Sequence, residues 1–329
     1  MREITYREAL REAMQEEMRR DPAVFLMGED IGRYGGVYSV TKGLLKEFGD
    51  KRVLDTPISE AVIAGAGTGA AAVGARPVIE IMYVNFMTFC MDQIVNQAAK
   101  MRYMFGGKIK VPLVIRTQGG AGTYCAAQHS ESLEAWFTHV PGLKVVMPAT
   151  PYDAKGLLKS SIRDDNVVIF IEHNLLYNRK GQVPQDEYLV PLGVADIKRE
   201  GQDVTVITYS SMVSVSLEAA DELAAAGISA EVIDLRTLRP LDMATILNSV
   251  QKTGRVVVCE PDCKTGGVGA EIVSQITERA FDDLDAPPVR VAGRDTPIPY
   301  SPALEKLAVP DKHEIVKAVN GLFNRKSGL

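Results

Sequence analysis

The sequence lacks the long apolar runs and the strong charge of one sign that mark membrane-spanning or nucleic-acid-binding chains. Its apolar runs are interrupted by charged residues before they reach the roughly 20 residues that a spanning helix needs. The net charge of -5 is small for 329 residues, and acidic and basic residues are interspersed. No electrostatic footprint for nucleic acid or an anionic membrane is therefore visible, and we expect neither partner.

Cysteine is also scarce. The spacings of the four cysteines match neither a disulfide framework nor a zinc site: Cys90, Cys125, Cys259 and Cys263. We expect all four to be buried or half-buried free thiols. The first residues show no apolar stretch after a basic start, which indicates no secretory signal, so we expect a cytoplasmic (bacterial) or matrix-type protein that is not secreted.

What remains is the composition of a globular α/β protein with two domains. Hydrophobic residues make up 46% and charged residues 24% of the chain, and strand-like runs alternate with helical periods in both halves. The alternation is lost between residues 178 and 201, where Pro184 and Pro191 lie. We therefore predict a first domain at 1–177, a linker at 178–201 and a second domain at 202–329, each with a mostly parallel sheet covered by helices.

The longest predicted helix runs from Asn85 to Phe105. It combines an apolar seam with a stripe rich in amide side chains, a pattern typical of a helix that contacts protein on more than one side. This pattern predicts oligomerisation.

A carboxylate, Glu60, stands where a predicted strand gives way to a helix of very small residues. Pro57 indicates a turn, and Ser59 is placed to cap the helix. A carboxylate between apolar walls is poorly solvated, which favours its protonated form and suits it to proton exchange near neutral pH. These residues alone favour the simpler interpretation, in which Glu60 compensates the helix dipole.

Glycines are frequent on that helix, at 65, 67, 69 and 74, but their spacing is not that of a nucleotide-binding loop. Close helix packing is the better explanation. A second glycine-rich stretch, from Gln118 to Ser130, is predicted to be a loop that follows a strand and carries His129. From the residues alone, His129 is equally suited to contact a ligand or to bond the backbone.

Several segments match one known family in order between residues 4 and 320: Gly28 to Asp30, Gly49 to Glu60, Asp92 to Lys100, Ala126 to Ser130, Pro141 to Val146 and Asp234 to Leu238. The chain resembles the beta subunits of thiamin-diphosphate-dependent 2-oxo acid dehydrogenases, most nearly those of pyruvate dehydrogenase. The resemblance implies a transketolase-like fold, with a pyrimidine-binding domain followed by a smaller transketolase C-terminal domain.

The resemblance gives Glu60 a catalytic role. It implies that Glu60 bonds a ring nitrogen of the cofactor's aminopyrimidine, so that the amino nitrogen can remove the thiazolium proton. It places Ile58, Met82 and Phe86 at the pyrimidine, with Phe86 against the ring face, and His129 near the reacting centre or the lipoyl acceptor. A potassium ion is implied at Leu113, Ser161, Asp164 and Asn166.

One family feature is missing. No Gly-Asp-Gly segment for a magnesium-diphosphate site occurs, and Gly49-Asp50 is followed by Lys51. The resemblance therefore implies no magnesium site in this chain and a separate alpha subunit that supplies the diphosphate and Mg²⁺ site. The expected assembly has two alpha and two beta chains that dock on a lipoyl-bearing acyltransferase core.

The implied activity is oxidative decarboxylation of pyruvate with acetyl transfer to a lipoyl domain. An acetoin dehydrogenase beta subunit is the nearest alternative, because Arg102 to Gly107 and Glu172 to Tyr177 look similar to it, whereas the short loop Gly32 to Gly36 favours pyruvate. A branched-chain 2-oxo acid enzyme fits Ala126 to Gln128 less well. A non-catalytic scaffold subunit is the alternative from another class.

Overall fold

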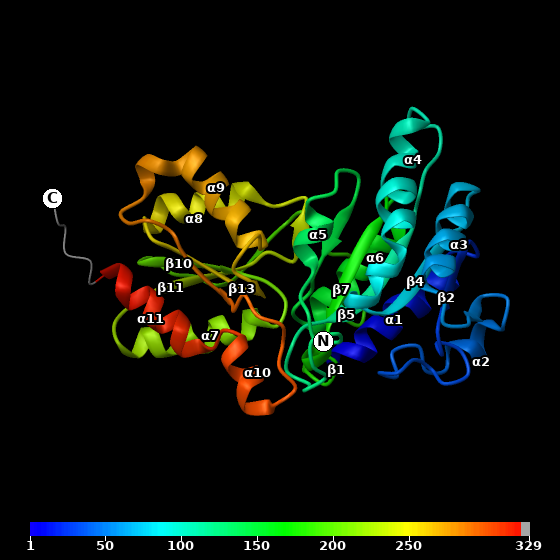
Figure 1. Cartoon of the computed structure of the whole chain (residues 1–329), viewed down its shortest axis with the longest axis horizontal. Coiled ribbons are helices and arrows are strands. Elements are labelled where there is room, and N and C mark those ends of the chain that lie inside the picture. The colour runs from blue at the N-terminus through cyan, green and yellow to red at the C-terminus, as the bar shows by residue number, and fades with distance from the viewer. Residues whose placement is uncertain (324–329) are drawn as a thin grey trace. The chain divides into compact units, whose positions relative to one another are not determined.

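The computed structural model describes residues 1–323, which form two compact units. The first unit comprises Met1–Gly119 and Trp136–Leu192, and the second comprises Gly120–Ala135 and the chain from Gly193 onward. Figure 1 shows both units as sheets with helices packed on them. Among the described residues, no helix is both long and apolar enough to cross a membrane.

The first unit is built on a parallel sheet with the strand order β6-β7-β5-β4-β2-β3. Two adjacent interior strands, β5 and β7, are buried along their whole length, as expected for a parallel sheet covered on both faces. The strands are β2 (Val24–Gly28), β3 (Val53–Asp55), β4 (Arg76–Tyr83), β5 (Val114–Gly119), β6 (Lys144–Val146) and β7 (Val168–His173). A short antiparallel pair joins β1 (Arg2–Thr5) to β8 (Lys180–Val183).

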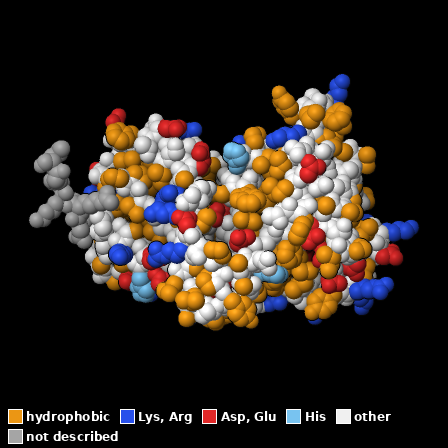
Figure 2. Space-filling view, in the orientation of Figure 1, with side chains coloured by type: hydrophobic (Ala, Val, Ile, Leu, Met, Phe, Trp, Pro, Cys, Tyr) orange, Lys and Arg blue, Asp and Glu red, His pale blue; other side chains and the backbone are white. Residues whose placement is uncertain are grey.

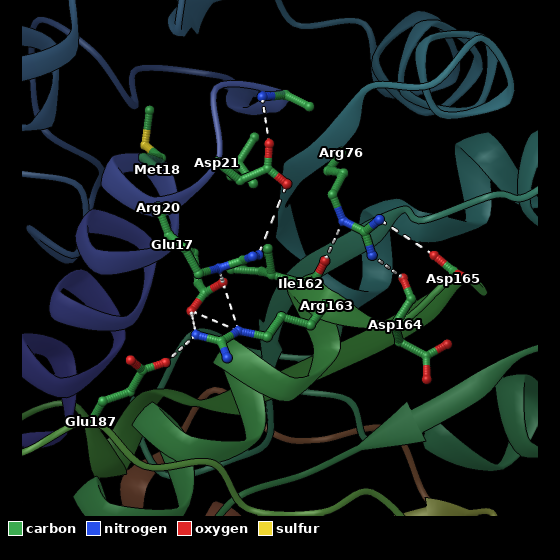
Figure 3. A network of polar contacts seen from close by, with 12 residues as sticks. Glu17, Met18, Arg20, Asp21, Arg76, Ile162, Arg163, Asp164, Asp165 and Glu187 are labelled. Carbon is green, nitrogen blue, oxygen red and sulfur yellow. Dashed lines mark hydrogen bonds and ion pairs between the residues drawn. The ribbon is translucent and has the colours of Figure 1, made fainter.

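Helices α1 (Tyr6–Arg20) and α6 (Pro151–Arg163) pack together in the core of this unit. A capping box between Thr5 and Glu8 starts α1, because each side chain bonds the other residue's backbone N–H. Fully buried Glu17 on α1 accepts hydrogen bonds from Arg163 on α6 and from Arg20, as Figure 3 shows. The shorter helices of this unit are α2 (Leu44–Phe48) and η3 (Asn174–Leu176), and α5 (Glu134–Thr138) begins in the segment assigned to the second unit.

The segment predicted as one long helix is helical but irregular. It consists of the 3₁₀ helix η1 (Val84–Cys90), the π-helix η2 (Gln93–Ala98) and α4 (Ala99–Met104). The predicted helical segment from Asn85 to Phe105 is therefore confirmed in extent but is divided among three helix types. Apolar periodicity alone does not separate an α-helix from 3₁₀ and π turns.

Helix α3 (Glu60–Ala72) packs on β4, η1 and η2. A Cβ atom at Gly67 would lie 2.8 Å from Cγ2 of Ile79, whereas one at Gly69 would meet no atom within 4 Å. The predicted role of small residues in close packing is thus confirmed at Gly67 and does not apply at Gly69.

The second unit has a sheet with the order β14-β13-β10-β11-β9, parallel except for β9 at its edge. Its strands are β9 (Asp196–Arg199), β10 (Val204–Thr208), β11 (Ala230–Asp234), β13 (Val256–Cys263) and β14 (Val289–Gly293). The remaining elements of this unit are β12 (Thr237–Arg239), α7 (Met212–Ala225), α8 (Met243–Thr253), α9 (Val268–Ala280), η4 (Phe281–Asp283), α10 (Pro302–Ala308) and α11 (Lys312–Phe323).

All four cysteines are free thiols, but their burial differs. Cys90 and Cys259 are buried and Cys125 is half-buried, as expected. Cys263 is exposed, so the expectation for that residue is wrong. It is the last residue of β13 and pairs with Gly293 beyond a shift in the register with β14.

Candidate functional site

Glu60 is the first residue of α3 and follows β3 after a short turn. Ser59 occupies the cap position, but its side chain makes no capping hydrogen bond, so the helix begins without the predicted side-chain cap. Glu60 is half-buried. The strand end is tied to the neighbouring loop by Asp55, whose carboxylate accepts the N–H groups of Gly32 at 2.5 Å and Arg33 at 3.0 Å.

Three carboxylates gather near the carboxyl ends of β2, β3 and β4. Glu29 follows β2, Glu60 follows β3 and Glu80 lies within β4. Burial raises the pKa of Glu29, and the charges of Glu60, Asp30 and Glu80 raise it further. Glu29 therefore keeps its proton to a higher pH than an isolated carboxyl group would.

The residues predicted at the pyrimidine flank this edge. Met82 and Phe86 are half-buried, Met82 on β4 and Phe86 on η1, which packs against α3. The Phe86 ring meets Tyr83 edge to face at a centroid distance of 5.4 Å. Ile58 is 81% exposed, so within this chain it has an open apolar surface next to Glu60.

A buried network of charged side chains shares a pocket with Met82. The guanidinium of Arg116 on β5 binds Glu172 on β7 through two hydrogen bonds of 2.7 and 2.9 Å, and Glu80 at 2.6 Å. The hydroxyl of Tyr177 donates to Glu172 at 2.7 Å. Burial raises the pKa of Glu172 to about 7, although the adjacent Arg116 acts in the opposite direction. These residues and Met82 line a narrow pocket together with Tyr38 and Gln118.

His129 belongs to the second unit, in the glycine-rich loop that the sequence predicts. Two backbone hydrogen bonds join parts of the loop. The N–H of Gly120 donates to the carbonyl of Glu131 at 3.0 Å, and the N–H of His129 donates to the carbonyl of Ala126 at 3.3 Å. His129 is half-buried. The structure thus confirms the loop from Gly120 onward, while Gln118 and Gly119, predicted as part of it, end β5. Glu60, Met82 and Phe86 lie in the first unit and His129 in the second.

A cluster of buried acids lies in the second unit and was not predicted. The hydroxyl of Tyr209 donates to Glu134 at 3.0 Å, and both side chains are buried. Burial, followed by the charge of Asp262, raises the pKa of Glu134 well above its usual range. Burial also raises the pKa of Glu260 to about 7, while its carboxylate accepts the N–H of Gly269 at 2.7 Å at the start of α9.

The residues predicted to bind potassium surround the turn between α6 and β7. The carbonyl of Leu113 accepts the N–H of Val168 at 2.9 Å, and that of Ser161 accepts the N–H of Asp164 at 3.2 Å. The carboxylate of Asp164 accepts hydrogen bonds from the backbone and side chain of Asn166 at 2.8 and 2.7 Å.

A cation of the chain already lies at this turn. Arg76 donates to the carbonyls of Ile162 and Asp164, both at 2.9 Å, and pairs with Asp165 at 3.3 Å (Figure 3). Asp164 also pairs with Lys144. Ser161, Asp164 and Asn166 are thus joined at one turn beside two basic side chains, whereas the carbonyl of Leu113 is bonded to Val168 on β7.

The donor set near Glu60 fits one part of thiamin diphosphate. Helix α3, which carries the half-buried Glu60, packs against β4 with Met82 and against η1 with Phe86, so a carboxylate, a thioether and an aromatic ring are available to bond and enclose an aminopyrimidine. Among the described residues, no group of three or more His, Cys, Asp or Glu side chains is arranged to hold a metal ion.

Comparison with known proteins agrees with this architecture. Residues 2–180 match the family model of the transketolase pyrimidine-binding domain, and residues 193–315 match that of the transketolase C-terminal domain. A solved split-gene transketolase, described as an inactive beta4 tetramer, is similar in fold, with a TM-score of 0.81 at 23% identity over 98% of this chain and 99% of that one. These matches define a two-domain transketolase-type protein.

Two relatives resolve the class further. The pyruvate dehydrogenase E1 component subunit beta of Rhizobium meliloti is 50% identical over 323 residues, which are 98% of this chain and 70% of that protein. The acetoin:2,6-dichlorophenolindophenol oxidoreductase subunit beta of Cupriavidus necator is 50% identical over 327 residues, 96% of each chain. The chain belongs to the family of pyruvate dehydrogenase E1 beta subunits, which work in thiamin-diphosphate-dependent complexes with an alpha subunit.

Proposed function

We propose that this chain is the beta subunit of a pyruvate dehydrogenase E1 component. Together with an alpha subunit it would decarboxylate pyruvate oxidatively and pass the acetyl group to a lipoyl domain. The observation that carries the proposal is the placement of Glu60 at the start of α3, beside Glu29 and Glu80 and within a chain of this family. Residues 1–177 would form the pyrimidine-binding domain and 202–329 the C-terminal domain.

Glu60 would hold the cofactor's aminopyrimidine and exchange a proton with its ring nitrogen. When bound, thiamin diphosphate supplies the carbon nucleophile that attacks the 2-oxo group. Glu60 is half-buried at the start of α3, so its carboxylate has limited contact with water and is free to bond a ring nitrogen of the pyrimidine. Met82 and Phe86 would enclose the ring, and Ile58 would complete the wall. His129 would assist proton transfer or position the lipoyl acceptor.

The alpha subunit would supply the diphosphate and Mg²⁺ site, in an assembly of two alpha and two beta chains. Exposed apolar side chains on the first unit support a large subunit interface: Ile58, Val62, Val73, Phe89, Tyr103, Met104 and Phe105. Figure 2 shows hydrophobic side chains gathered near α4. We also propose docking on a lipoyl-bearing acyltransferase core and a cytoplasmic or matrix-type location.

A potassium ion at the turn after α6 is part of the proposal. The carbonyls of Leu113, Ser161 and Asp164, together with Asn166, would bind it and brace β5 against β7. Because Arg76 and Lys144 already bind Asp164, the ion would have to share the oxygens of this turn with them.

Acetoin dehydrogenase is the second candidate, supported by the 50% identity to the Cupriavidus necator subunit. The short loop Gly32 to Gly36 favours pyruvate.

The test is co-expression with an alpha-type chain, followed by reduction of an artificial acceptor with pyruvate, acetoin or a branched 2-oxo acid, with and without thiamin diphosphate and Mg²⁺. Cofactor-dependent turnover of pyruvate supports the proposal. Preference for acetoin would replace the substrate but keep the chemistry, and a well-formed complex inactive on all three would contradict it.

A further inference from the structure

The loop that carries His129 has positive φ angles at four residues, two of which are not glycine. Gly120 and Gly122 have φ values of 89° and 115°, which glycine adopts readily. Tyr124 and Ala126 have φ values of 60° and 62°, in the left-handed region that non-glycine residues seldom occupy. Such a conformation persists only where surrounding contacts hold it.

One such contact comes from a residue far along the chain, Glu305 on α10. Its Oε1 accepts the N–H of Gly122 at 2.8 Å, and its Oε2 accepts the N–H of Tyr124 at 3.2 Å. The Glu305 side chain is buried, with 2% exposure. A single carboxylate therefore holds the backbone on both sides of Thr123 by charge-assisted hydrogen bonds.

Helix α10 is anchored independently of the loop. The N–H of Arg294, just after β14, donates to the carbonyl of Ala308 at the end of α10 at 2.9 Å. The guanidinium of Arg294 binds Glu314 on α11 at 2.6 Å. These contacts and the bonds of Glu305 all lie within the second unit, so its fold provides a fixed base from which the carboxylate reaches the loop.

We propose that Glu305 is a positioning residue of the functional site, which fixes the 122–124 turn and thereby the place at which His129 is presented. The inference rests on the proposed role of His129 in transfer to the lipoyl acceptor. Glu305 touches no reacting atom; it acts through the backbone of the loop.

The test compares Glu305→Ala and Glu305→Gln with Lys306→Ala, an exposed neighbour on the same helix, in the assembled alpha-beta complex. Loss of Glu305 should speed hydrogen exchange at the amides of residues 122 and 124 by about tenfold or more, because their acceptor is lost. Glu305→Gln retains the shape and one acceptor oxygen, so it should show a smaller effect and covers the case in which the alanine variant does not assemble. Lys306→Ala should leave these amides unchanged.

The functional arm uses two acceptors. Acetylation of a lipoyl domain by Glu305→Ala should fall about tenfold or more, while dye reduction with pyruvate falls much less. In a His129→Ala background, Glu305→Ala should change lipoyl acetylation by less than about twofold, since both residues act through one loop. Unchanged amide exchange, equal losses with both acceptors, or full additivity would overturn the inference. If the complex has no activity on pyruvate, that result contradicts the proposed function. The hydrogen-exchange measurement still shows whether Glu305 holds the loop.

Discussion

Arg116 and Glu172 form a bidentate ion pair between the adjacent buried strands β5 and β7, with side-chain exposures of only 3% and 1%. Two charges so far from solvent are costly unless each is fully bonded. The additional bonds from Arg116 to Glu80 and from Tyr177 to Glu172 meet that condition. The network thereby connects the middle of the sheet to the acidic edge on which Glu60 lies.

Removal of one side chain of the Arg116–Glu172 pair should lower the free energy of unfolding. We expect Arg116→Met to destabilise the first unit by about 3–5 kcal/mol, because it leaves Glu172 buried without its cation. The matched control is Arg19→Met, which removes a solvent-exposed pair with Glu47 and should cost less than about 1 kcal/mol. Hydrogen exchange of the β5 and β7 amides in the assembled complex measures both changes. Similar small effects for the two variants would refute the account of the network.

Two glycines on one helix should respond oppositely to a methyl group. Gly69→Ala adds a Cβ into open space on α3 and should stabilise the chain by about 0.5–1 kcal/mol through helix propensity. Gly67→Ala places the Cβ 2.8 Å from Ile79 and should destabilise it by about 1 kcal/mol after that gain is subtracted. The midpoints of thermal unfolding of this chain without the alpha subunit test the pair, because the space at Gly69 is open within this chain. An increase for both would show that the contact between α3 and β4 relaxes freely.

The pH dependence of stability should change with Glu260. The folded chain keeps a proton on this carboxyl up to about pH 7, because burial raises its pKa from the ordinary value of 4.5. The folded state therefore binds more protons than the unfolded state between these two values, and stability falls as the pH rises through that window.

Glu260→Gln removes this ionisation and retains an oxygen that can accept the N–H of Gly269. Relative to the variant, the wild-type chain should lose on the order of 2 kcal/mol of unfolding free energy between pH 5 and pH 8. Chemical denaturation at the two pH values measures the difference, with Glu278→Gln at an exposed position on α9 as the control. Parallel pH profiles for wild type and Glu260→Gln would mean that the Glu260 carboxyl is already ionised when folded.

Strands and helices with a clear hydrophobic pattern were predictable from the sequence, whereas short elements without one were not. The apolar runs Val111 to Arg116 and Val167 to Glu172 predict strands, which the structure contains as β5 and β7 with shifted ends. The helical period from Thr5 to Arg20 predicts α1. Strand β9 was missed because Asp196 to Arg199 is short and charged, as edge strands often are. Helix α10 was missed as well, since seven residues are too few for a clear period.

In the candidate site, contacts between residues far apart in the sequence could not be predicted. Glu60 and His129 stand next to turns and glycines that can be recognised in sequence. Arg116 and Glu172 are 56 residues apart, and Glu305 lies 181 residues from Tyr124, so only the folded chain brings these partners together. An isolated acid within an apolar strand, as at Glu80 or Glu172, is the sequence signal that could have indicated a buried network.

The central claim is that Glu60 of this chain exchanges a proton required for turnover, and one comparison tests it most directly. Pyruvate-dependent dye reduction is measured for complexes of the alpha subunit with wild type, Glu60→Gln or Glu271→Gln, after sizing confirms equal assembly. Glu271 is also an acid in the first turn of a helix, so its variant reproduces the loss of dipole compensation alone. We expect Glu60→Gln to lose roughly a hundredfold or more in turnover and Glu271→Gln to remain near wild type. Equal activity of the two variants would contradict the account and leave Glu60 with a structural role.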